Sequence, residues 1–402
     1  MEISAKMKKR ILFLTKDAMC KSYLPIYGNK YWRGKTPNID ELAEKGTVFN
    51  HFIAAAPSTV MSFRAMMTGK FAHEQPYDRY VPLERTEDKT DFFCEASRLG
   101  YKCHIIWDEN WEKVVLRYGN CYGKETIIHN LPGLKQGVGC YYNRKEPVMR
   151  DERKSEKAIN TLMDRVNAIC NNDENILLWI HLPHVINGRN GYGTDIDLLD
   201  LVIGRLREYF EDDCIFISAD HGNMNGFHGK VGYGFDVDLP AIEIPLITPR
   251  IESCDKECDL FLSNVDVKDL ILYRKITKRD FIFSDCAYYA QPHRKIAIIH
   301  NGMLYQYSKA TQKEFLYDIM IDPNEKMNLI NDIVYDGDRK LHVSIKEVYF
   351  YPSWEKIARE RVVLRNKKDE VWKNAPLLVE LREKFIRKAK NIYIVFKYRF
   401  FK

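Results

Sequence analysis

The chain has 402 residues, of which 45% are hydrophobic, and its 62 basic and 56 acidic side chains leave a formal net charge of +6. That length is sufficient for one large hydrophobic core and a smaller second unit. So weak a positive charge does not require a nucleic-acid partner, and we expect none.

Membrane and secretory signals are not evident in the sequence. No apolar run approaches the roughly 18 residues of a membrane-spanning helix, and the first residues lead into a charged segment rather than the apolar core of a secretory signal. The ten cysteines are scattered, and the closest pair, Cys254 and Cys258, lacks the second pair or the histidines of a zinc site. We therefore expect reduced thiols and a cytoplasmic protein.

In chain order, the first predicted elements are a short strand and a helix. Residues 11–14 form an apolar run that predicts a buried strand ending shortly before Asp17. The run Thr36-Pro37-Asn38 predicts the start of a helix, with Asn38 as its N-cap and Gly46 as its end.

Strands and helices continue to alternate as far as residue 220. Apolar runs and helical spacing predict, in order, a strand at 48–53, helices at 62–67 and 92–99, a strand at 104–107, a helix at 157–169, a strand at 176–180, a helix at 196–210 and a strand at 215–220. Such repeated units favour a mostly parallel sheet with helices on both faces. The stretch 118–153, rich in Gly, Asn and Tyr, is expected to form an irregular wall of the active site.

The pattern changes after about residue 290. Short β-like runs at 296–299 and 303–307 flank Asn301-Gly302, a pair typical of a tight hairpin turn. We therefore expect three parts: an α/β catalytic domain over residues 1–285, an antiparallel subdomain over 286–335, and a basic, aromatic-rich extension over 336–402.

Chemically reactive side chains gather at the predicted strand ends. Asp220 and His221 follow one buried strand, and Asp17 follows another. A third segment, residues 56–62, leads into a helix and contains Thr59. Because parallel strands end at a common edge, two carboxylates, an imidazole and a hydroxyl there would form a metal site with an activated nucleophile.

Four blocks of sequence, in order, resemble the sulfatase and alkaline-phosphatase superfamily. They are Asp17 to Gly46 with its Thr-Pro-Asn-Ile-Asp helix, the nucleophile helix at 59–69, Asp220-His221-Gly222 with His228-Gly229, and the turn at 316–329. The likeness covers about residues 8–335. It implies an alkaline-phosphatase-like α/β fold, in which helices sandwich a mixed, mostly parallel sheet and a small C-terminal antiparallel β subdomain follows.

Departures from the family pattern favour one branch of it. Sulfatases carry Cys or Ser, converted to formylglycine, within a Cys/Ser-x-Pro-Ser-Arg signature, whereas this chain has Thr59 and, at the Arg position, Phe63. Threonine cannot give that aldehyde. Trp107-Asp108-Glu109-Asn110 replaces the sulfate-contacting Gly-Lys-Trp-His, and Ala18 replaces the second N-terminal Asp. The chain thus resembles the phosphoglycerol and phosphoethanolamine transferases and the phosphodiesterases, which use a Thr or Ser alkoxide.

This resemblance implies a divalent metal ion held by Asp17, Thr59, Asp220 and His221. Coordination would lower the pKa of the Thr59 hydroxyl, which would attack phosphorus at the start of a helix whose N–H groups favour an anion. Ligation by both oxygen and nitrogen suits Mn²⁺ or Zn²⁺ better than Mg²⁺ or Ca²⁺.

Histidines and a lysine near these blocks are candidates for the remaining roles. His181 or His228 would protonate the leaving oxygen, while His184 and Lys230 would contact the substrate. Each has a simpler explanation as a packed loop histidine, an exposed loop residue or an ordinary surface lysine. The three histidines also permit a second metal ion, although no extra carboxylate is evident. Thr59 itself has the alternative of being a helix cap, with Ser58 as the nucleophile.

We therefore predict metal-dependent phosphoryl transfer, by a phosphodiesterase or a phospho-alcohol transferase, through a covalent Thr59 intermediate on a glycan or lipid-linked precursor. Two alternatives are sulfate-ester hydrolysis without formylglycine and a catalytically silent glycan-binding protein. Retention of Asp17, Thr59, Asp220 and His221 together argues against the silent protein.

The C-terminal residues 382–402 mix eight basic side chains with Phe, Ile and Tyr. Such a mixture docks on anionic membrane faces. A terminal helix and strand packed on the core, with a solvated charged face, is the slightly preferred explanation. The oligomeric state is not indicated by the sequence.

Overall fold

The computed structural model describes most of the chain. The described residues are 10–28, 35–74, 89–109, 122–135, 152–172, 174–183, 194–286, 291–330, 334–336, 339–341, 354–375, 377–382, 384–386 and 388–389. His184, much of the predicted wall at 118–153 and most of the tail at 382–402 lie outside them.

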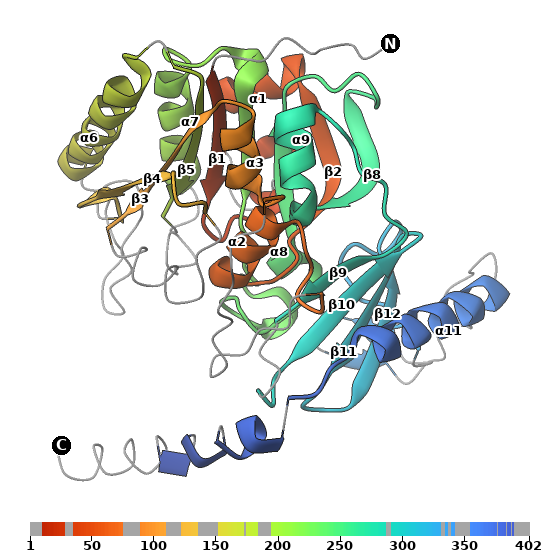
Figure 1. Ribbon diagram of the computed structural model, residues 1–402. Helices are drawn as coiled ribbons and strands as arrows, with labels where there is room; N and C mark the ends of the chain where they lie inside the picture. The colour runs from red at the N-terminus through yellow and green to blue at the C-terminus, as the bar shows by residue number, and fades with distance from the viewer. Residues whose placement is uncertain are drawn as a thin grey trace.

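An eight-stranded sheet forms the centre of the protein (Figure 1). Its order is β4-β3-β5-β1-β6-β7-β2-β8, and every neighbouring pair is parallel except the two pairs that contain β7. The strands are β1 (Arg10–Lys16), β2 (Thr47–Ile53), β3 (Lys102–Asp108), β4 (Ile127–Leu131), β5 (Ile176–Leu182), β6 (Ile215–Ala219), β7 (Glu243–Thr248) and β8 (Glu257–Ser263). The predicted mixed, mostly parallel sheet is confirmed.

Helices cover both faces of this sheet. The helices around the sheet are α1 (Pro37–Lys45), α2 (Thr59–Thr68), α3 (Phe92–Arg98), α6 (Glu152–Cys170), α7 (Thr194–Leu206), α8 (Leu239–Ile242) and α9 (Val267–Tyr273). Helices α1 and α6 pack beside α7, while α3 and α9 pack beside α2. The two groups form the outer layers of the sandwich that the sequence predicts.

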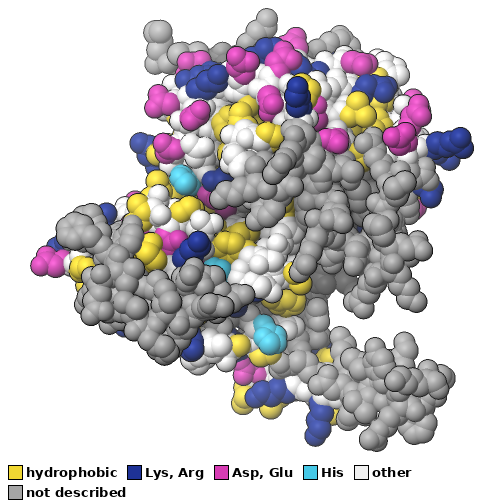
Figure 2. Space-filling view, turned by 180° about the vertical axis from the view of Figure 1, so that it is seen from behind, with side chains coloured by type: hydrophobic (Ala, Val, Ile, Leu, Met, Phe, Trp, Pro, Cys, Tyr) yellow, Lys and Arg dark blue, Asp and Glu magenta, His cyan; other side chains and the backbone are white. Residues whose placement is uncertain are grey.

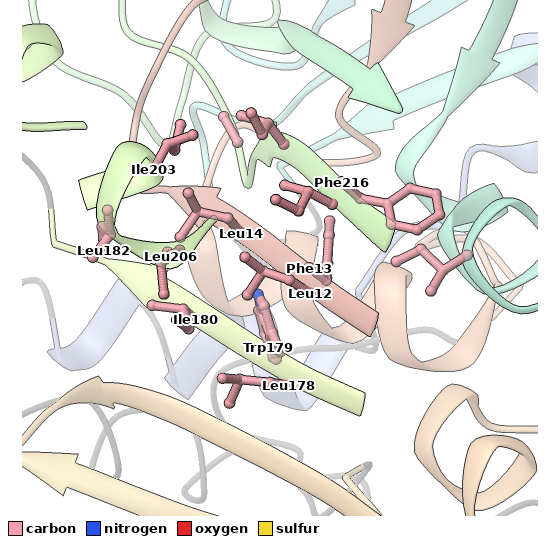
Figure 3. Packing of buried hydrophobic residues seen from close by; sticks show 14 of the residues in the cluster. Leu12, Phe13, Leu14, Leu178, Trp179, Ile180, Leu182, Ile203, Leu206 and Phe216 are labelled. Carbon is pink, nitrogen blue, oxygen red and sulfur yellow. The ribbon is translucent and has the colours of Figure 1, made fainter. Parts of the chain in front are cut away.

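Side chains of the central strands β1 and β5 point alternately toward the two helix layers. Residues alternate between the two faces of a strand, and Ile203 and Leu206 of α7 lie near Leu14 of β1 (Figure 3). On the opposite face, Trp179 of β5 packs edge-on against Phe63 of α2, with the ring centroids 4.6 Å apart. The odd-numbered residues of β1 and β5 therefore face α2, which begins at Thr59.

Helix α1 begins two residues earlier than predicted. Pro37 occupies its first turn and Thr36 is the N-cap residue, so the prediction of Asn38 as N-cap is wrong. Proline fits the first helical position because its missing N–H would have no partner there. Asn38 lies inside the helix and instead donates a hydrogen bond to Asp200 Oδ2 of α7, at 2.9 Å.

A second, four-stranded antiparallel sheet follows. Its strands are β9 (Ile282–Asp285), β10 (Lys295–His300), β11 (Met303–Ser308) and β12 (Lys313–Asp318), in the order β12-β11-β10-β9. Asn301 and Gly302 both have positive φ, 50° and 76°, as the tight turn between β10 and β11 requires. Helix α11 (Trp354–Val371) packs on β10 and β11, and β13 (Val334–Asp336) pairs with β14 (Arg339–Leu341). The division of the chain into three parts stays a prediction.

Charged side chains of both signs lie on the surface of the described residues. Acidic and basic side chains intermingle over the described face in Figure 2. No disulfide joins the eight cysteines within the described ranges. Among the helices that the structure describes, none is both long and apolar enough to cross a bilayer.

Candidate active site

The carboxyl ends of β1, β5 and β6 meet the first turn of α2. Asp17 directly follows β1 and Asp220 directly follows β6, whereas His181 lies near the end of β5. Thr59 is the first residue of α2, and all four side chains are buried. The ends of adjacent parallel strands thus bring these groups together, as the sequence predicts.

Asp220 is held by two backbone groups. Its Oδ1 accepts hydrogen bonds from the N–H of Ala18 at 3.0 Å and of His221 at 2.8 Å. Ala18 has φ of 56°, a left-handed conformation that is unfavourable for alanine and turns its N–H toward this carboxylate. None of the described residues donates a hydrogen bond to the other oxygen, Oδ2, which lies 3.4 Å from His221 Nε2.

His221 links the carboxylates to Thr59. Its Nδ1 lies 2.8 Å from the carbonyl oxygen of Gly222, which only accepts hydrogen bonds, so Nδ1 carries the proton and Nε2 presents a lone pair. The Nε2 atom lies 3.6 Å from Asp17 Oδ1, and the Thr59 hydroxyl donates to it at 3.0 Å. The predicted group of Asp17, Thr59, Asp220 and His221 is therefore assembled around one ring nitrogen.

Helix α2 is attached to the same site by its second turn. The Ser62 hydroxyl donates to the carbonyl oxygen of Asp220 and accepts a hydrogen bond from Asn264 Nδ2 at 2.6 Å. Asn264 Oδ1 also accepts from the N–H of Ala55, at 2.9 Å. Asn264 thus fixes the loop before Thr59 to Asp220. Sequence reasoning missed this residue, since a lone Asn after a strand has no distinguishing pattern.

Thr59 rather than Ser58 faces the ligand group. Ser58 is the N-cap residue by its backbone conformation, with φ of −150° and ψ of 143°, but its side chain caps no helix N–H. Its hydroxyl has no hydrogen-bond partner among the described residues, whereas that of Thr59 contacts His221.

His181 is fully buried beside the carboxylates. Burial lowers the pKa of this histidine to about 4. Its Nδ1 lies 2.9 Å from the Thr15 hydroxyl, and Phe63 packs edge-on against its ring at 4.6 Å between centroids. Phe63, which stands at the position of the sulfatase Arg, therefore supports a histidine here.

Two other predicted residues lie elsewhere on the described surface. His228 is exposed in the short helix Phe227–Gly229, and its Nε2–H donates to the carbonyl oxygen of Asn324 at 3.2 Å. Lys230 forms ion pairs with Asp236, at 3.1 Å, and with Asp238. Burial opposes the charge of Lys230, but Asp238 and Asp236 outweigh it and raise the pKa of this lysine. Neither residue contacts Thr59 within the part of the chain that the structure describes, so their catalytic and substrate-binding roles stay predictions.

An aromatic residue that the sequence did not indicate stands next to His221. The Tyr233 ring centroid lies 4.6 Å from that of His221, and 39% of Tyr233 is exposed. Burial, together with the negative charges of Asp17 and Asp220, raises the pKa of its phenol. Tyr233 therefore stays neutral at the solvent side of the site.

The donor set fits a divalent cation. Ligand atoms of Asp17, His181 and Asp220 lie within 4.8 Å of one another, and the lone pair of His221 is also directed at both carboxylates. Two buried carboxylates so close together are unfavourable unless a cation compensates them. Carboxylate and imidazole ligands together are typical of Mn²⁺ and Zn²⁺ sites.

Solved structures share the fold over most of the chain. A phosphonate monoester hydrolase of Agrobacterium radiobacter is 14% identical, with a TM-score of 0.60, and the match covers 90% of this chain and 96% of that one. A 2-O GAG sulfatase is 13% identical, with a TM-score of 0.62 and coverages of 90% and 92%. A protein in complex with its substrate D-glucosamine-2-N,6-O-disulfate is 14% identical, with a TM-score of 0.60 and coverages of 90% and 97%.

The sequence comparison finds similarity to sulfatases over part of the chain. The family model named Sulfatase matches residues 9–185. Human arylsulfatase D is 30% identical over 145 residues, which are 34% of this chain and 23% of the arylsulfatase. The resemblance of the motifs to the sulfatase and alkaline-phosphatase superfamily is confirmed.

Proposed function

We propose that the protein is a metal-dependent phosphoryl-transfer enzyme, a phosphodiesterase or a phospho-alcohol transferase, that works through a covalent Thr59 intermediate. The observation that carries the proposal is the position of the Thr59 hydroxyl, 3.0 Å from the His221 lone pair at the edge where Asp17 and Asp220 meet. A hydroxyl, two carboxylates and an imidazole are the parts that a metal-assisted oxygen nucleophile requires.

Asp17, Asp220 and His221 would hold the metal ion, together with Thr59 Oγ1. When bound there, the ion supplies positive charge that lowers the pKa of a coordinated hydroxyl and neutralises phosphoryl oxygens. In the proposed reaction the Thr59 hydroxyl gives up its proton to water as a bond forms between Oγ1 and phosphorus, and the bond from phosphorus to the leaving oxygen breaks as that oxygen takes up a proton from water. Water or an acceptor hydroxyl then takes the phosphoryl group from Thr59.

The start of α2 assists an anionic substrate. Thr59 is the first residue of a ten-residue helix, whose first N–H groups have no partner within the helix. These groups and the helix dipole favour negative charge near Thr59. Ser62 and Asn264 keep this end of the helix against Asp220, so the donors and the nucleophile stay in register.

Sulfate-ester hydrolysis is the second candidate, because the Sulfatase family model matches residues 9–185, which include Thr59, and arylsulfatase D is 30% identical to part of the chain. Thr59 argues against it, since threonine cannot become formylglycine. Phe63 argues against it too, because the cation expected there by resemblance is replaced by an apolar ring that packs on His181.

The substrate is proposed to be a phosphorylated glycan or a lipid-linked precursor reached from the cytoplasm. A glycan is favoured because a protein of similar fold binds a glucosamine disulfate, at 14% identity to this chain. His228 and Lys230 remain candidates for contact with the distal parts of such a substrate.

Turnover of three model esters tests the proposal. Bis(p-nitrophenyl) phosphate, p-nitrophenyl phosphate and p-nitrophenyl sulfate would be offered to the Mn²⁺- or Zn²⁺-loaded protein and to Thr59→Ala. We expect phosphoester cleavage that Thr59→Ala abolishes and that Thr161→Ala, in α6, leaves unchanged. Sulfate cleavage that survives Thr59→Ala would overturn the proposal, and binding of sulfated glycans without any turnover would favour the silent alternative.

A further inference from the structure

Two imidazoles face the same pair of carboxylates, but their Nδ1 atoms have different kinds of partner. His221 Nδ1 faces a carbonyl oxygen, that of Gly222. His181 Nδ1 faces a hydroxyl, that of Thr15, at 2.9 Å. A carbonyl oxygen only accepts a hydrogen bond, whereas a hydroxyl both accepts and donates. The position of the proton on His181 therefore depends on what else the Thr15 hydroxyl does.

The Thr15 hydroxyl has two hydrogen-bond partners among the described residues. The indole N–H of Trp179 donates to its oxygen at 2.8 Å, since an indole nitrogen has no acceptor capacity. His181 Nδ1 is the other partner. The hydroxyl proton thus has one acceptor within reach, and a buried donor without an acceptor is unfavourable. Thr15 therefore donates to His181 Nδ1.

An imidazole that accepts at Nδ1 carries its proton on Nε2. The two rings then offer opposite groups to Asp17 and Asp220, a lone pair from His221 and an N–H from His181. Packing keeps the second ring in place, because Phe63 lies edge-on to it at 4.6 Å and β1 and β5 hold Thr15 opposite His181 in register.

We propose that His181 is a fixed N–H donor to an oxygen of the bound phosphoryl group and not a metal ligand, and that Thr15 and Trp179 are the positioning residues that set its tautomer. The identity of the bound anion rests on the proposed function, whereas the tautomer does not. Proximity to Asp17 and Asp220 alone would make His181 a third ligand. A metal ligand needs a lone pair on the facing nitrogen, however, and here that nitrogen carries a proton.

The tautomer is measured directly on the unaltered protein. Two-bond ¹H–¹⁵N correlation spectra of ¹⁵N-histidine-labelled protein distinguish an Nε2–H ring from an Nδ1–H ring, and the His181→Asn spectrum assigns the signals. We expect His181 as the Nε2–H form and His221 as the Nδ1–H form. Thr15→Ser should keep this assignment, since it keeps the hydroxyl, whereas Thr15→Val should shift His181 toward a mixture. An Nδ1–H tautomer for His181 in the unaltered protein would overturn the proposal.

Metal titration separates the two histidines without any turnover. Calorimetric titration with Mn²⁺ or Zn²⁺ should show an affinity loss on the order of tenfold or more for His221→Ala, and a change below about threefold for His181→Asn. A comparable loss for both variants would make His181 a ligand and would overturn the proposal. Inactivity toward phosphoesters would refute the proposed function but leave both of these measurements intact.

Discussion

The absence of a side chain at Gly222 determines how the backbone packs around His221. A Cβ atom on Gly222 would lie 2.0 Å from the carbonyl oxygen of Pro240, while the N–H of Gly222 bonds to the carbonyl oxygen of Ala241 at 2.9 Å. The glycine is therefore needed for close approach of two backbone segments. That approach also places the Gly222 carbonyl oxygen against His221 Nδ1.

Gly222→Ala should destabilise the protein by about 3 kcal/mol, because the clash is with backbone and the chain must shift. The matched control is Gly229→Ala, where a Cβ meets nothing within 4 Å and the strain comes from a φ of +71°. We expect about 1 kcal/mol for that control. Urea unfolding of both variants checks the difference, and equal losses would show that Gly222 is not required for close packing.

One pair of strands at the edge of the large sheet carries a hydrogen-bonded histidine pair. His104 of β3 and His129 of β4 lie 3.0 Å apart, from Nδ1 to Nε2, so one ring nitrogen donates and the other accepts. Burial is the main cause that lowers the pKa of each to about 4. Lys102 and Arg165 lower these pKa values further, whereas Glu174 acts in the opposite direction.

This pair should make the edge sensitive to acid. Because the folded-state pKa values lie below the ordinary histidine value of about 6.5, the unfolded chain takes up protons first as the pH falls. The stabilising contribution is thus fully present above about pH 6.5 and is lost toward pH 4. We expect the melting temperature to fall less steeply between about pH 6.5 and pH 4, the range of that loss, in His104→Gln than in the unaltered protein. Parallel pH profiles would contradict this explanation.

Elements that follow simple periodicity could be predicted from the sequence, and contacts between distant segments could not. The apolar runs at 11–14, 176–180 and 215–220 correspond to β1, β5 and β6. Their common edge then brings Asp17, Asp220 and the Thr59 helix together. The N-cap of α1 was missed because Pro37 outweighs Asn38, whose partner Asp200 lies 162 residues away.

The residues that support the site could not be predicted from the sequence for the same reason. Thr15 and Trp179 occupy ordinary strand positions, and only the register of β1 against β5 makes them partners of His181. Asn264 and Tyr233 act through loops that approach Asp220 and His221 from elsewhere in the chain. The local spacing of residues in the sequence does not predict any of these contacts.

A buried ion pair connects the small sheet to the rest of the protein. Arg294 contacts Asp285 of β9 through two nitrogens, at 2.6 and 3.2 Å, and both residues are buried. The guanidinium group lies 3.9 Å from the ring of Trp372, just beyond α11, and the N–H of Asp285 donates to the carbonyl oxygen of Ala55 at 3.0 Å. The same pair thus joins α11, the small sheet and the loop before Thr59.

Arg294→Met should destabilise the protein by about 3–5 kcal/mol, because it leaves the Asp285 carboxylate buried without its guanidinium partner. Arg365→Met is the control, since Arg365 pairs with Glu314 at 2.9 Å on a much more exposed surface and should cost below about 1 kcal/mol. Denaturant unfolding measures both. Similar small losses would show that the buried pair does not hold the parts together.

The C-terminal stretch presents an exposed apolar side. Residues 377–382 and 384–386 are helical, and Glu380 forms an ion pair at 2.8 Å with Lys309, which directly follows β11 of the small sheet. Large apolar side chains are exposed at Leu377, Leu378, Leu381 and Phe385, with basic residues between and after them. Apolar and basic groups together in helical segments are typical of sequences that lie on anionic membranes.

We expect the full chain to co-sediment with vesicles containing phosphatidylserine and a chain lacking residues 382–402 to lose most of that binding. Vesicles of phosphatidylcholine alone are the control, since they lack the anionic charge. Equal binding to both kinds of vesicle, or none to either, would contradict a membrane role for the tail.

The central claim is that Thr59 becomes covalently phosphorylated. The most direct measurement mixes metal-loaded protein with bis(p-nitrophenyl) phosphate, stops the reaction with acid within the first turnover, and locates the added mass by peptide mass spectrometry. We predict a p-nitrophenyl phosphoryl group on Thr59, together with a burst of one p-nitrophenol per active site. A burst with the added group on Ser58, or steady turnover that persists in Thr59→Ala, would contradict the account.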